Sequence, residues 1–97
     1  MPIQLSELAE ESLYEIVAYY VGAVSEDFSE SIEKRILDQI DAINGFEKSI
    51  PVSEIFPGTR KLVISKLPYV AFIRERSAGS WEVVDIARTS RKLPKLK

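Results

Sequence analysis

The sequence predicts a small α+β domain, with a short N-terminal strand and an antiparallel helix hairpin packed on a small antiparallel β-sheet. In its first half, apolar residues recur at spacings of three and four, which is typical of amphipathic helices. In its second half, three runs rich in β-branched and aromatic residues are separated by short turn-forming segments. The 97 residues fit a single domain, 1–97, because one hydrophobic core usually serves roughly 100–150 residues.

The N-terminal strand and the first helix are predicted from residues 3–22. Residues 3–5 alternate apolar and polar side chains, which favours a short edge strand. Ser6 is a good helix N-cap, and the glutamates that follow it suit the positive end of a helix dipole. One apolar stripe continues to about Gly22 and is formed by Leu8, Leu13, Ile16, Val17, Tyr20 and Val21.

A second helix is predicted between Ser25 and Asn44-Gly45. Ser25 is again an N-cap followed by acidic residues, and Asn44-Gly45 is a good left-handed C-cap. Intervals of four, four, four and three produce one apolar stripe, formed by Phe28, Ile32, Ile36, Ile40 and Ile43. Because only residues 23–24 separate the two helices, we expect an antiparallel hairpin with facing stripes.

Three strands are predicted after a loop at residues 46–58. The runs 59–66, 69–76 and 81–88 have the composition of strands, and their short connections make them an antiparallel meander. We expect the helix hairpin to cover one face of this sheet. The predicted contacts join Leu13, Ile16, Val17, Tyr20, Phe28, Ile32, Ile36 and Ile40 of the helices to Leu62, Ile64, Val70, Phe72, Val84 and Ile86 of the strands.

The charges are divided between the two halves of the chain. Residues 1–56 hold 3 basic and 12 acidic side chains, a net charge of −9. Residues 57–97 hold 10 basic and 3 acidic side chains, a net charge of +7, so the overall −2 is a cancellation. The basic half, which ends in a basic tail at residues 89–97, offers a docking pole to an anionic partner.

Cysteine and histidine are both absent. Their absence excludes disulfides, thiol nucleophiles, and thiolate or imidazole metal ligands, and we expect no cofactor and no metal. No apolar run approaches the ~20 residues that span a bilayer, and the first residues lack the features of a signal peptide. We therefore expect a cytoplasmic protein without a membrane partner.

Three short motifs follow one another in the second half of the chain. Residues 57–61 are Pro-Gly-Thr-Arg-Lys, residues 68–69 are Pro-Tyr, and residues 84–94 follow the pattern V-x-[IV]-x-H-x-x-R-x-x-P, with Arg88 in place of the histidine. With these motifs and the expected order of elements, the chain resembles the RelE/ParE toxin superfamily. More specifically, it resembles the ParE-like, plasmid-stabilisation branch.

This resemblance implies the toxin of a bacterial type II toxin–antitoxin pair, neutralised by a cognate antitoxin and in contact with operator DNA only through it. The ParE-like branch is associated with poisoning of DNA gyrase, which is our first hypothesis. The second is a RelE-like endonuclease that cleaves mRNA on the ribosome, although Val63, Val70 and Arg88 depart from the residues of that branch. The third is a non-toxic, autoregulatory partner of the antitoxin.

The candidate site residues come from the basic half. If the chain is a ribonuclease, the cations that stabilise the transition state are Arg60, Lys61, Arg88 and Arg91. Without histidine, the base would be a lysine or a carboxylate such as Glu47 or Glu54. The predicted target-binding residues are Arg60, Tyr69, Arg88, Arg91, Lys92 and Lys95.

Each of these assignments has a structural alternative. Instead of binding a phosphate or carboxylate, Arg60 would form an ion pair with an acid on one of the helices. Instead of stacking on a base, Tyr69 would fill the junction between the helix hairpin and the sheet. Trp81 is predicted to pack rather than to bind, and residues 89–97 would serve either for docking or for solubility.

Overall fold

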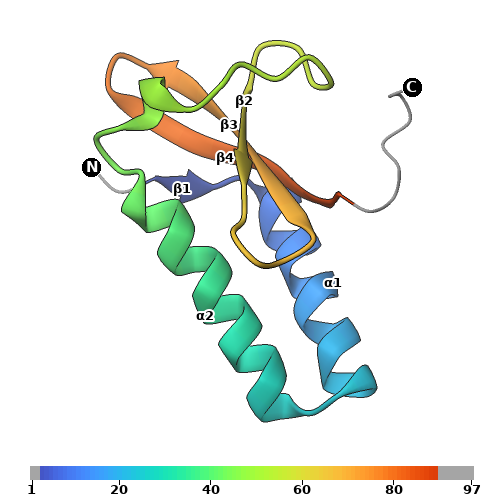
Figure 1. Ribbon diagram of the computed structural model, residues 1–97. Helices are drawn as coiled ribbons and strands as arrows, with labels where there is room; N and C mark the ends of the chain where they lie inside the picture. Colours follow the sequence, from blue (N-terminus) through green and yellow to red (C-terminus); the bar gives the residue numbers. More distant parts are fainter. Residues whose placement is uncertain (1–2, 90–97) are drawn as a thin grey trace.

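The computed structural model describes residues 3–89 and has the predicted α+β order of elements (Figure 1). The two helices run antiparallel and extend away from the sheet, which lies across one end of the hairpin (Figure 1). The elements are β1 (Gln4–Leu5), α1 (Glu7–Ala23), α2 (Glu26–Ala42), the 3₁₀ helix η1 (Glu47–Ser49), β2 (Arg60–Val63), β3 (Tyr69–Ser77) and β4 (Ser80–Arg88).

The strands form one sheet in the order β1-β4-β3-β2. β2, β3 and β4 are the predicted antiparallel meander, and β1 is the predicted edge strand. The sheet is nevertheless mixed, because β1 pairs with β4 in parallel. Nearly the whole chain separates these two strands, so no tight turn dictates an antiparallel pairing.

Ser6 joins the start of α1 to β4. Its hydroxyl accepts a hydrogen bond from the backbone N–H of Ala9 at 3.0 Å, which caps the helix as predicted. The same hydroxyl donates to the Val84 carbonyl at 2.8 Å, and the Ser6 backbone N–H donates to the Val83 carbonyl at 2.9 Å. The N-terminus of α1 is therefore fixed on β4.

α2 is capped at its N-terminus and tied to the sheet near its C-terminus. Ser25 caps its N-terminus by accepting a hydrogen bond from the Phe28 N–H at 3.1 Å. Near its C-terminal end, the Gln39 side-chain amide pairs with the backbone of Ser65, with Ser65 N–H to Oε1 at 2.6 Å and Nε2 to the Ser65 carbonyl at 3.2 Å. This pair ties α2 to the turn between β2 and β3.

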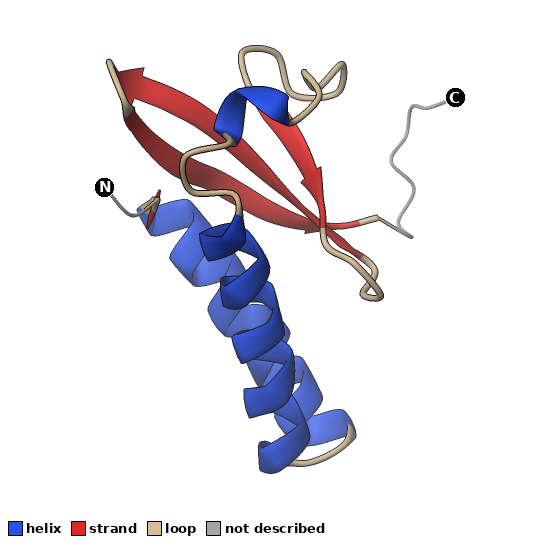
Figure 2. Ribbon diagram, turned by 60° about the vertical axis from the view of Figure 1, so that its left-hand side comes forward, coloured by secondary structure: helices blue, strands red, loops and turns tan. Residues whose placement is uncertain are grey.

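The main core lies between the helix hairpin and one face of the sheet (Figure 2). Its buried residues are Ala9, Leu13, Ile32, Ile36, Ile40, Ile64, Tyr69, Ala71, Ile73, Trp81, Val83 and Ile86. Four predicted core residues are partly buried against it, namely Ile16, Val17, Tyr20 and Leu62. Trp81 packs in this core, as expected.

The predicted contribution of Val84 to this core is wrong, and Val83 takes its place. The register between β3 and β4 shifts, so that Phe72 pairs with Asp85 whereas Ile73 pairs with Val83. Val84 is the extra residue of a β-bulge, which interrupts the alternation of faces along the strand. Val83 and Ile86 can then both contribute to the main core, although strict alternation along the strand would place their side chains on opposite faces of the sheet.

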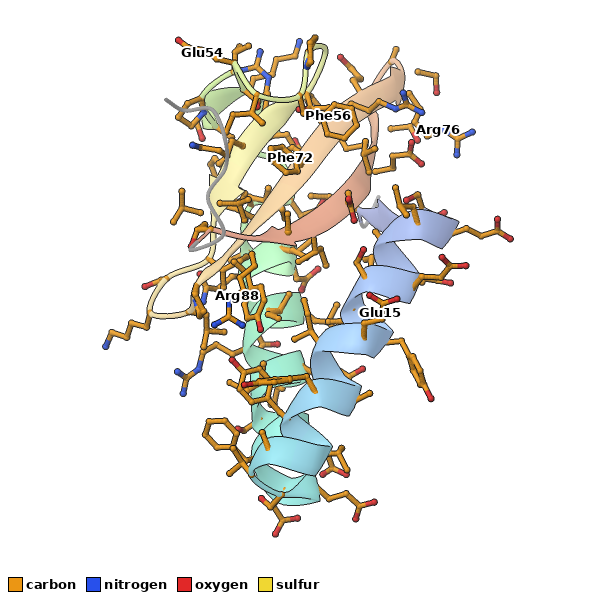
Figure 3. All side chains as sticks on the ribbon, turned by 90° about the vertical axis from the view of Figure 1, so that its right-hand side faces the viewer. Glu15, Glu54, Phe56, Phe72, Arg76 and Arg88 are labelled. Atoms are coloured by element: carbon orange, nitrogen blue, oxygen red, sulfur yellow. The ribbon has the colours of Figure 1, made fainter. Side chains whose placement is uncertain are left out.

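Val70 and Phe72 are buried as predicted but lie outside the main core. They alternate along β3 with Tyr69, Ala71 and Ile73, which face the helices, so they belong to the opposite face of the sheet. Phe56 covers this second face, with its ring centroid 5.4 Å from that of Phe72 (Figure 3). The sheet is therefore partly covered on both sides.

The predicted loop before β2 is an ordered cover with its own hydrogen bonds. The Pro51 carbonyl accepts from the Lys61 N–H at 2.8 Å, and the Thr59 carbonyl accepts from the Ser53 N–H at 2.9 Å. The Ser53 hydroxyl also accepts from the N–H groups of Ile55 and Phe56, each at 3.1 Å. These bonds turn the segment back along β2 and place Phe56 on the sheet.

The predicted burial of Phe28 is wrong, since its side chain is 41% exposed. Phe28 lies in the first turn of α2, at the tip of the hairpin, which extends beyond the sheet (Figure 1). Its ring contacts Tyr20 with centroids 5.5 Å apart. At this position α1 supplies a packing partner and the sheet does not.

Replacing Ile36 with alanine should destabilise the protein by roughly 2–5 kcal/mol, as for other buried aliphatic side chains. Ile36 is fully buried in the main core, so its truncation leaves a cavity between helices and sheet. The free energy of unfolding in denaturant measures the loss. Leu8→Ala is the control, because Leu8 is 51% exposed on α1 and should change stability by about 0.5 kcal/mol or less. Equal effects of the two substitutions would contradict this assignment of the core.

Candidate functional site

The structure places the predicted site residues that it describes in two groups on the sheet, Arg60 with Lys61 and Tyr69 with Arg88, which are paired in register. Arg60 and Lys61 begin β2, Tyr69 begins β3, and Arg88 ends β4. The other predicted residues, Arg91, Lys92 and Lys95, lie outside the described residues.

Arg60 is bound to the preceding loop. Its Nη1 donates to the Ile50 carbonyl at 2.7 Å and to the Lys48 carbonyl at 3.3 Å. Both acceptors are backbone carbonyls of the loop. Arg60 is therefore held by hydrogen bonds to the backbone and not by the ion pair with a helix acid that the sequence analysis considered. The guanidinium instead supports the covering loop, which explains an arginine at the start of an edge strand.

Tyr69 fills the junction between the hairpin and the sheet. Its side chain is buried, and its hydroxyl donates a hydrogen bond to the hydroxyl of Tyr20 at 3.3 Å. Burial, and then this hydrogen bond, raise the pKa of Tyr69 above its usual value near 10. The ring offers no open face to a base, so the geometry favours the packing role over the stacking role.

Arg88 lies beside a shallow hollow next to α1. It is paired in register with Tyr69 at the end of the sheet, where Figure 3 shows it on the same side as Glu15. The hollow has a volume of about 240 Å³ and is lined by Ser12, Glu15, Ile16, Tyr19, Tyr69, Ile86 and Arg88. Arg88 is thus the described cation nearest to the segment that continues into the basic tail.

The described cations do not form one phosphate site. Arg60 pairs with Ile73, and Arg88 pairs with Tyr69, four residues earlier in β3, so the two arginines are about 14 Å apart along the strand direction and lie on non-adjacent strands. Lys61 follows Arg60 directly, and neighbouring strand residues point to opposite faces. As placed, the Arg60 guanidinium is engaged by backbone carbonyls and Lys61 lies on the other face, so the described cations are not assembled around one phosphate.

The two carboxylates considered as a base do not complete a catalytic group with these cations. Glu47 is buried, and its Oε2 accepts a hydrogen bond from the Gly45 N–H at 3.0 Å, which closes the turn after α2. Glu54 lies in the covering loop, at the end of the sheet away from Arg88 (Figure 3). Within residues 3–89, no cluster of acids is arranged to hold a metal ion, and no helix has the length and apolarity needed to cross a bilayer.

A further charged group occupies the far end of the β3–β4 hairpin. Glu82 is buried and accepts from Arg74, with N–O distances of 3.0 Å to both Nε and Nη2. Arg76 lies 3.8 Å from the same carboxylate. With Glu75 between them in β3, the two arginines are matched by two glutamates, and this end of the sheet is remote from Arg88 (Figure 3).

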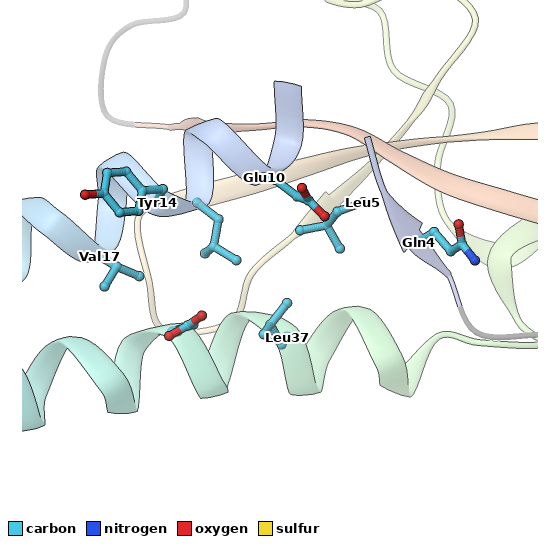
Figure 4. Close-up of a pocket in the computed structure, with 8 residues that line it drawn as sticks. Gln4, Leu5, Glu10, Tyr14, Val17 and Leu37 are labelled. Atoms are coloured by element: carbon cyan, nitrogen blue, oxygen red, sulfur yellow. The ribbon is translucent and has the colours of Figure 1, made fainter. Parts of the chain in front are cut away.

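Among the hollows lined by the described residues, the one with the greatest volume lies between the two helices, where the sequence analysis assigned no site (Figure 4). This interhelical groove has a volume of about 670 Å³ and is lined by Gln4, Leu5, Glu10, Leu13, Tyr14, Val17, Glu33 and Leu37. The sequence carries no local signal for it, because the groove depends on the angle between the two helices. Figure 1 shows the reason in space, because the helices separate as they approach the sheet.

The comparisons with known proteins concern the fold. No family model matches the chain, and no curated protein matches it. Among solved structures, a chain described as "Chromosomal ParDE TA system from P. aeruginosa" is similar, with a TM-score of 0.80 and 21% sequence identity. The similarity covers 91% of this chain and 95% of that chain. The fold expected from the sequence resemblance, that of ParE-like proteins, is therefore confirmed.

Replacing Arg60 with alanine should loosen the covering loop and cost about 1–3 kcal/mol, because two backbone carbonyls lose a charged donor. Denaturant unfolding and limited proteolysis between residues 46 and 59 measure the two effects. Lys61→Ala is the matched control, since it removes the neighbouring cation from the other face. If both variants unfold and are cleaved alike, Arg60 does not hold the loop.

The buried Tyr69 hydroxyl should make stability depend on alkaline pH. Because the folded state raises the pKa of Tyr69, its stabilising contribution is complete below the usual value near 10 and is lost as pH rises above it. The free energy of unfolding, measured from pH 9 to pH 11, should fall less steeply in Tyr69→Phe than in the wild type. Tyr14→Phe should keep the wild-type slope, because Tyr14 is 73% exposed. Identical slopes in all three proteins would contradict the prediction.

Proposed function

We propose that this chain is a ParE-like toxin of a bacterial type II toxin–antitoxin pair, which inhibits DNA gyrase and is neutralised by a cognate antitoxin. The observation that carries the proposal is the fold, which is similar over nearly the full length of both chains to a chain of a ParDE system. The sequence motifs at 57–61 and 84–94 support the same branch.

The arrangement of charged residues favours a binding function over bond cleavage. Arg60 is engaged by the covering loop, Lys61 faces the other side of β2, and Arg88 lies at the end of β4. Metal-free RNA cleavage requires a base, an acid and several cations around one phosphate. The described residues do not assemble such a group, so a poison that traps its target by docking fits them better.

Docking is assigned to the basic end of the chain. β4 ends at Arg88, and the sequence continues with Arg91, Lys92, Lys95 and Lys97 without an acid. Such a segment suits a nucleoprotein target, because each cation placed near a phosphate adds a salt-dependent contribution to the affinity. The second candidate, a ribosome-dependent mRNA endonuclease, uses the same charges, and Arg60, Lys61, Arg88 and Arg91 would then be catalytic.

Expression of the chain with and without its co-expressed antitoxin tests the proposal. We expect growth arrest with filamentation and a DNA-damage response when the antitoxin is absent, and relief when it is present. Purified chain should inhibit supercoiling by gyrase and accumulate cleavage complexes. Cleavage of mRNA in a purified translation system would instead establish the endonuclease, and growth without any arrest would establish the non-toxic alternative.

Deleting residues 90–97 should abolish gyrase inhibition and leave the fold intact. The deletion starts after Thr89 because its N–H donates to the Pro68 carbonyl at 2.8 Å and closes the end of the sheet. Arg88→Ala should have a smaller, graded effect, because docking by several cations does not depend on any one of them. If Arg88→Ala alone lowered activity by roughly 10²–10³, as the removal of a preorganised catalytic group does, the result would count against the hypothesis of a gyrase poison.

A further inference from the structure

We propose that a surface where α2 meets the sheet binds the phosphate backbone of duplex DNA, through Arg35, Lys66 and Arg88. These three residues define the junction surface. The inference rests on the proposed function and deepens it, since it makes the DNA of the gyrase complex a direct partner of this chain. It also assigns two binding residues, Arg35 and Lys66, that the sequence analysis did not single out.

A side-chain contact of α2 brings the first two cations together. The Gln39 amide pairs with the backbone of Ser65 in the β2–β3 turn, through hydrogen bonds of 2.6 and 3.2 Å. Lys66 is the next residue of that turn. Arg35 lies one helical turn before Gln39 and on the same side of α2. The Gln39–Ser65 pair therefore holds the base of both cationic side chains at one place.

The third cation lies at the same end of the sheet. The Thr89 N–H donates to the Pro68 carbonyl at 2.8 Å, and Arg88 is paired in register with Tyr69, directly after the turn. Figure 3 shows the β2–β3 turn and Arg88 at this end. Arg35, Lys66 and Arg88 are all exposed. The turn thus presents its lysine between an arginine of α2 and an arginine of β4.

The side of α2 that faces this turn carries no acid. Aspartate or glutamate occupies six of the 17 positions of the helix, and Glu33 among them lines the interhelical groove on the other side. None of the described ion pairs includes Arg35 or Lys66. Exposed cations without an acidic partner are the groups that bind phosphates and release counterions. The acid-free stripe consists of Phe28, Ser31, Arg35, Gln39 and Ala42.

The backbone of Lys66 is held in the left-handed region, with φ at 66°. Among the described residues, the other positive φ angles all belong to glycines, Gly45, Gly58 and Gly79. Glycine adopts this conformation without a steric penalty, whereas a lysine does not. Backbone strain of this kind is retained where the side chain has a function, and the exposed lysine packs into no core.

The backbone of a DNA duplex fits the junction surface better than a single strand does. A duplex carries about one negative charge per 1.7 Å of its axis, so cations on three elements can each reach a phosphate. A single strand is held by stacking of its bases, and the buried Tyr69 offers no open face to a base. Glu15 shares a hollow with Arg88, so we expect Arg35 and Lys66 to contribute most of the affinity.

Fluorescence anisotropy with a labelled duplex of about 20 base pairs tests the inference in a series of salt concentrations. We expect Arg35→Gln and Lys66→Gln each to weaken binding by the purified chain about tenfold at low salt. Each should also reduce the slope of log affinity against log salt by about 1, because one phosphate contact is lost. Lys34→Gln is the matched control, since this neighbour of Arg35 is already neutralised by Asp38 at 2.8 Å. Equal effects of all three substitutions would reduce the binding to net charge and refute the site.

Lys66→Gly separates binding from folding. Because glycine adopts the left-handed conformation freely, this variant should unfold at a denaturant concentration no lower than that of the wild type. It should nevertheless bind the duplex as weakly as Lys66→Gln. Lower stability together with unchanged DNA binding would give Lys66 a purely structural role and overturn its assignment.

Inhibition of gyrase supercoiling, measured on the same proteins, distinguishes the two levels of the argument. We expect Arg35→Gln and Lys66→Gln, but not Lys34→Gln, to inhibit less than the wild type. A wild-type chain that inhibits gyrase without binding the duplex, or inhibition unchanged in these variants, overturns the inference and leaves the proposed function standing. Tighter binding to single-stranded RNA than to the duplex also overturns it. Salt-dependent duplex binding through Arg35 and Lys66 without any inhibition of gyrase would support the surface and refute the proposed function.

Discussion

The attachment of α1 to β4 through Ser6 is the contact on which the rest of the architecture depends. One serine caps the helix through Ala9 and bonds the carbonyls of Val83 and Val84. Val84 is the bulged residue, which the strand ladder leaves partly unpaired, so its carbonyl is open to the Ser6 hydroxyl. Ser12 adds a second tie further along α1, with its hydroxyl 2.6 Å from Asp85. Helix direction, strand register and the parallel pairing of β1 are thereby coupled at one place.

The second face of the sheet depends on a different set of bonds. The Ser53 hydroxyl bonds the N–H groups of Ile55 and Phe56, and this turn of the covering loop brings Phe56 onto Phe72, while Arg60 holds the start of the same loop through the carbonyls of Lys48 and Ile50. The first five residues of β3 are consequently all buried, although no helix covers their outer side. The arginine of the family-like motif therefore has a structural role in this chain, and its presence alone is no argument for catalysis.

The same architecture separates the interhelical groove from the cations of the sheet. The hairpin is fixed on β4 at one end and on the β2–β3 turn through Gln39, so its helices diverge and leave the acid-rimmed groove between them. Arg60 and Arg88 lie on β2 and β4 outside this groove, and the basic sequence beyond Arg88 follows the end of β4.

The sequence by itself determined the elements, since capping serines, helical stripes and β-branched runs act over short distances and predict both helices and the meander. The division of charge between the two halves of the chain is likewise read directly from the order of the residues. Tertiary structure decided the rest. The bulge at Val84, the parallel pairing of β1 and the burial of Phe72 under Phe56 depend on contacts between residues far apart in the chain. The groove likewise exists only because of the angle between two helices, and no local pattern encodes that angle.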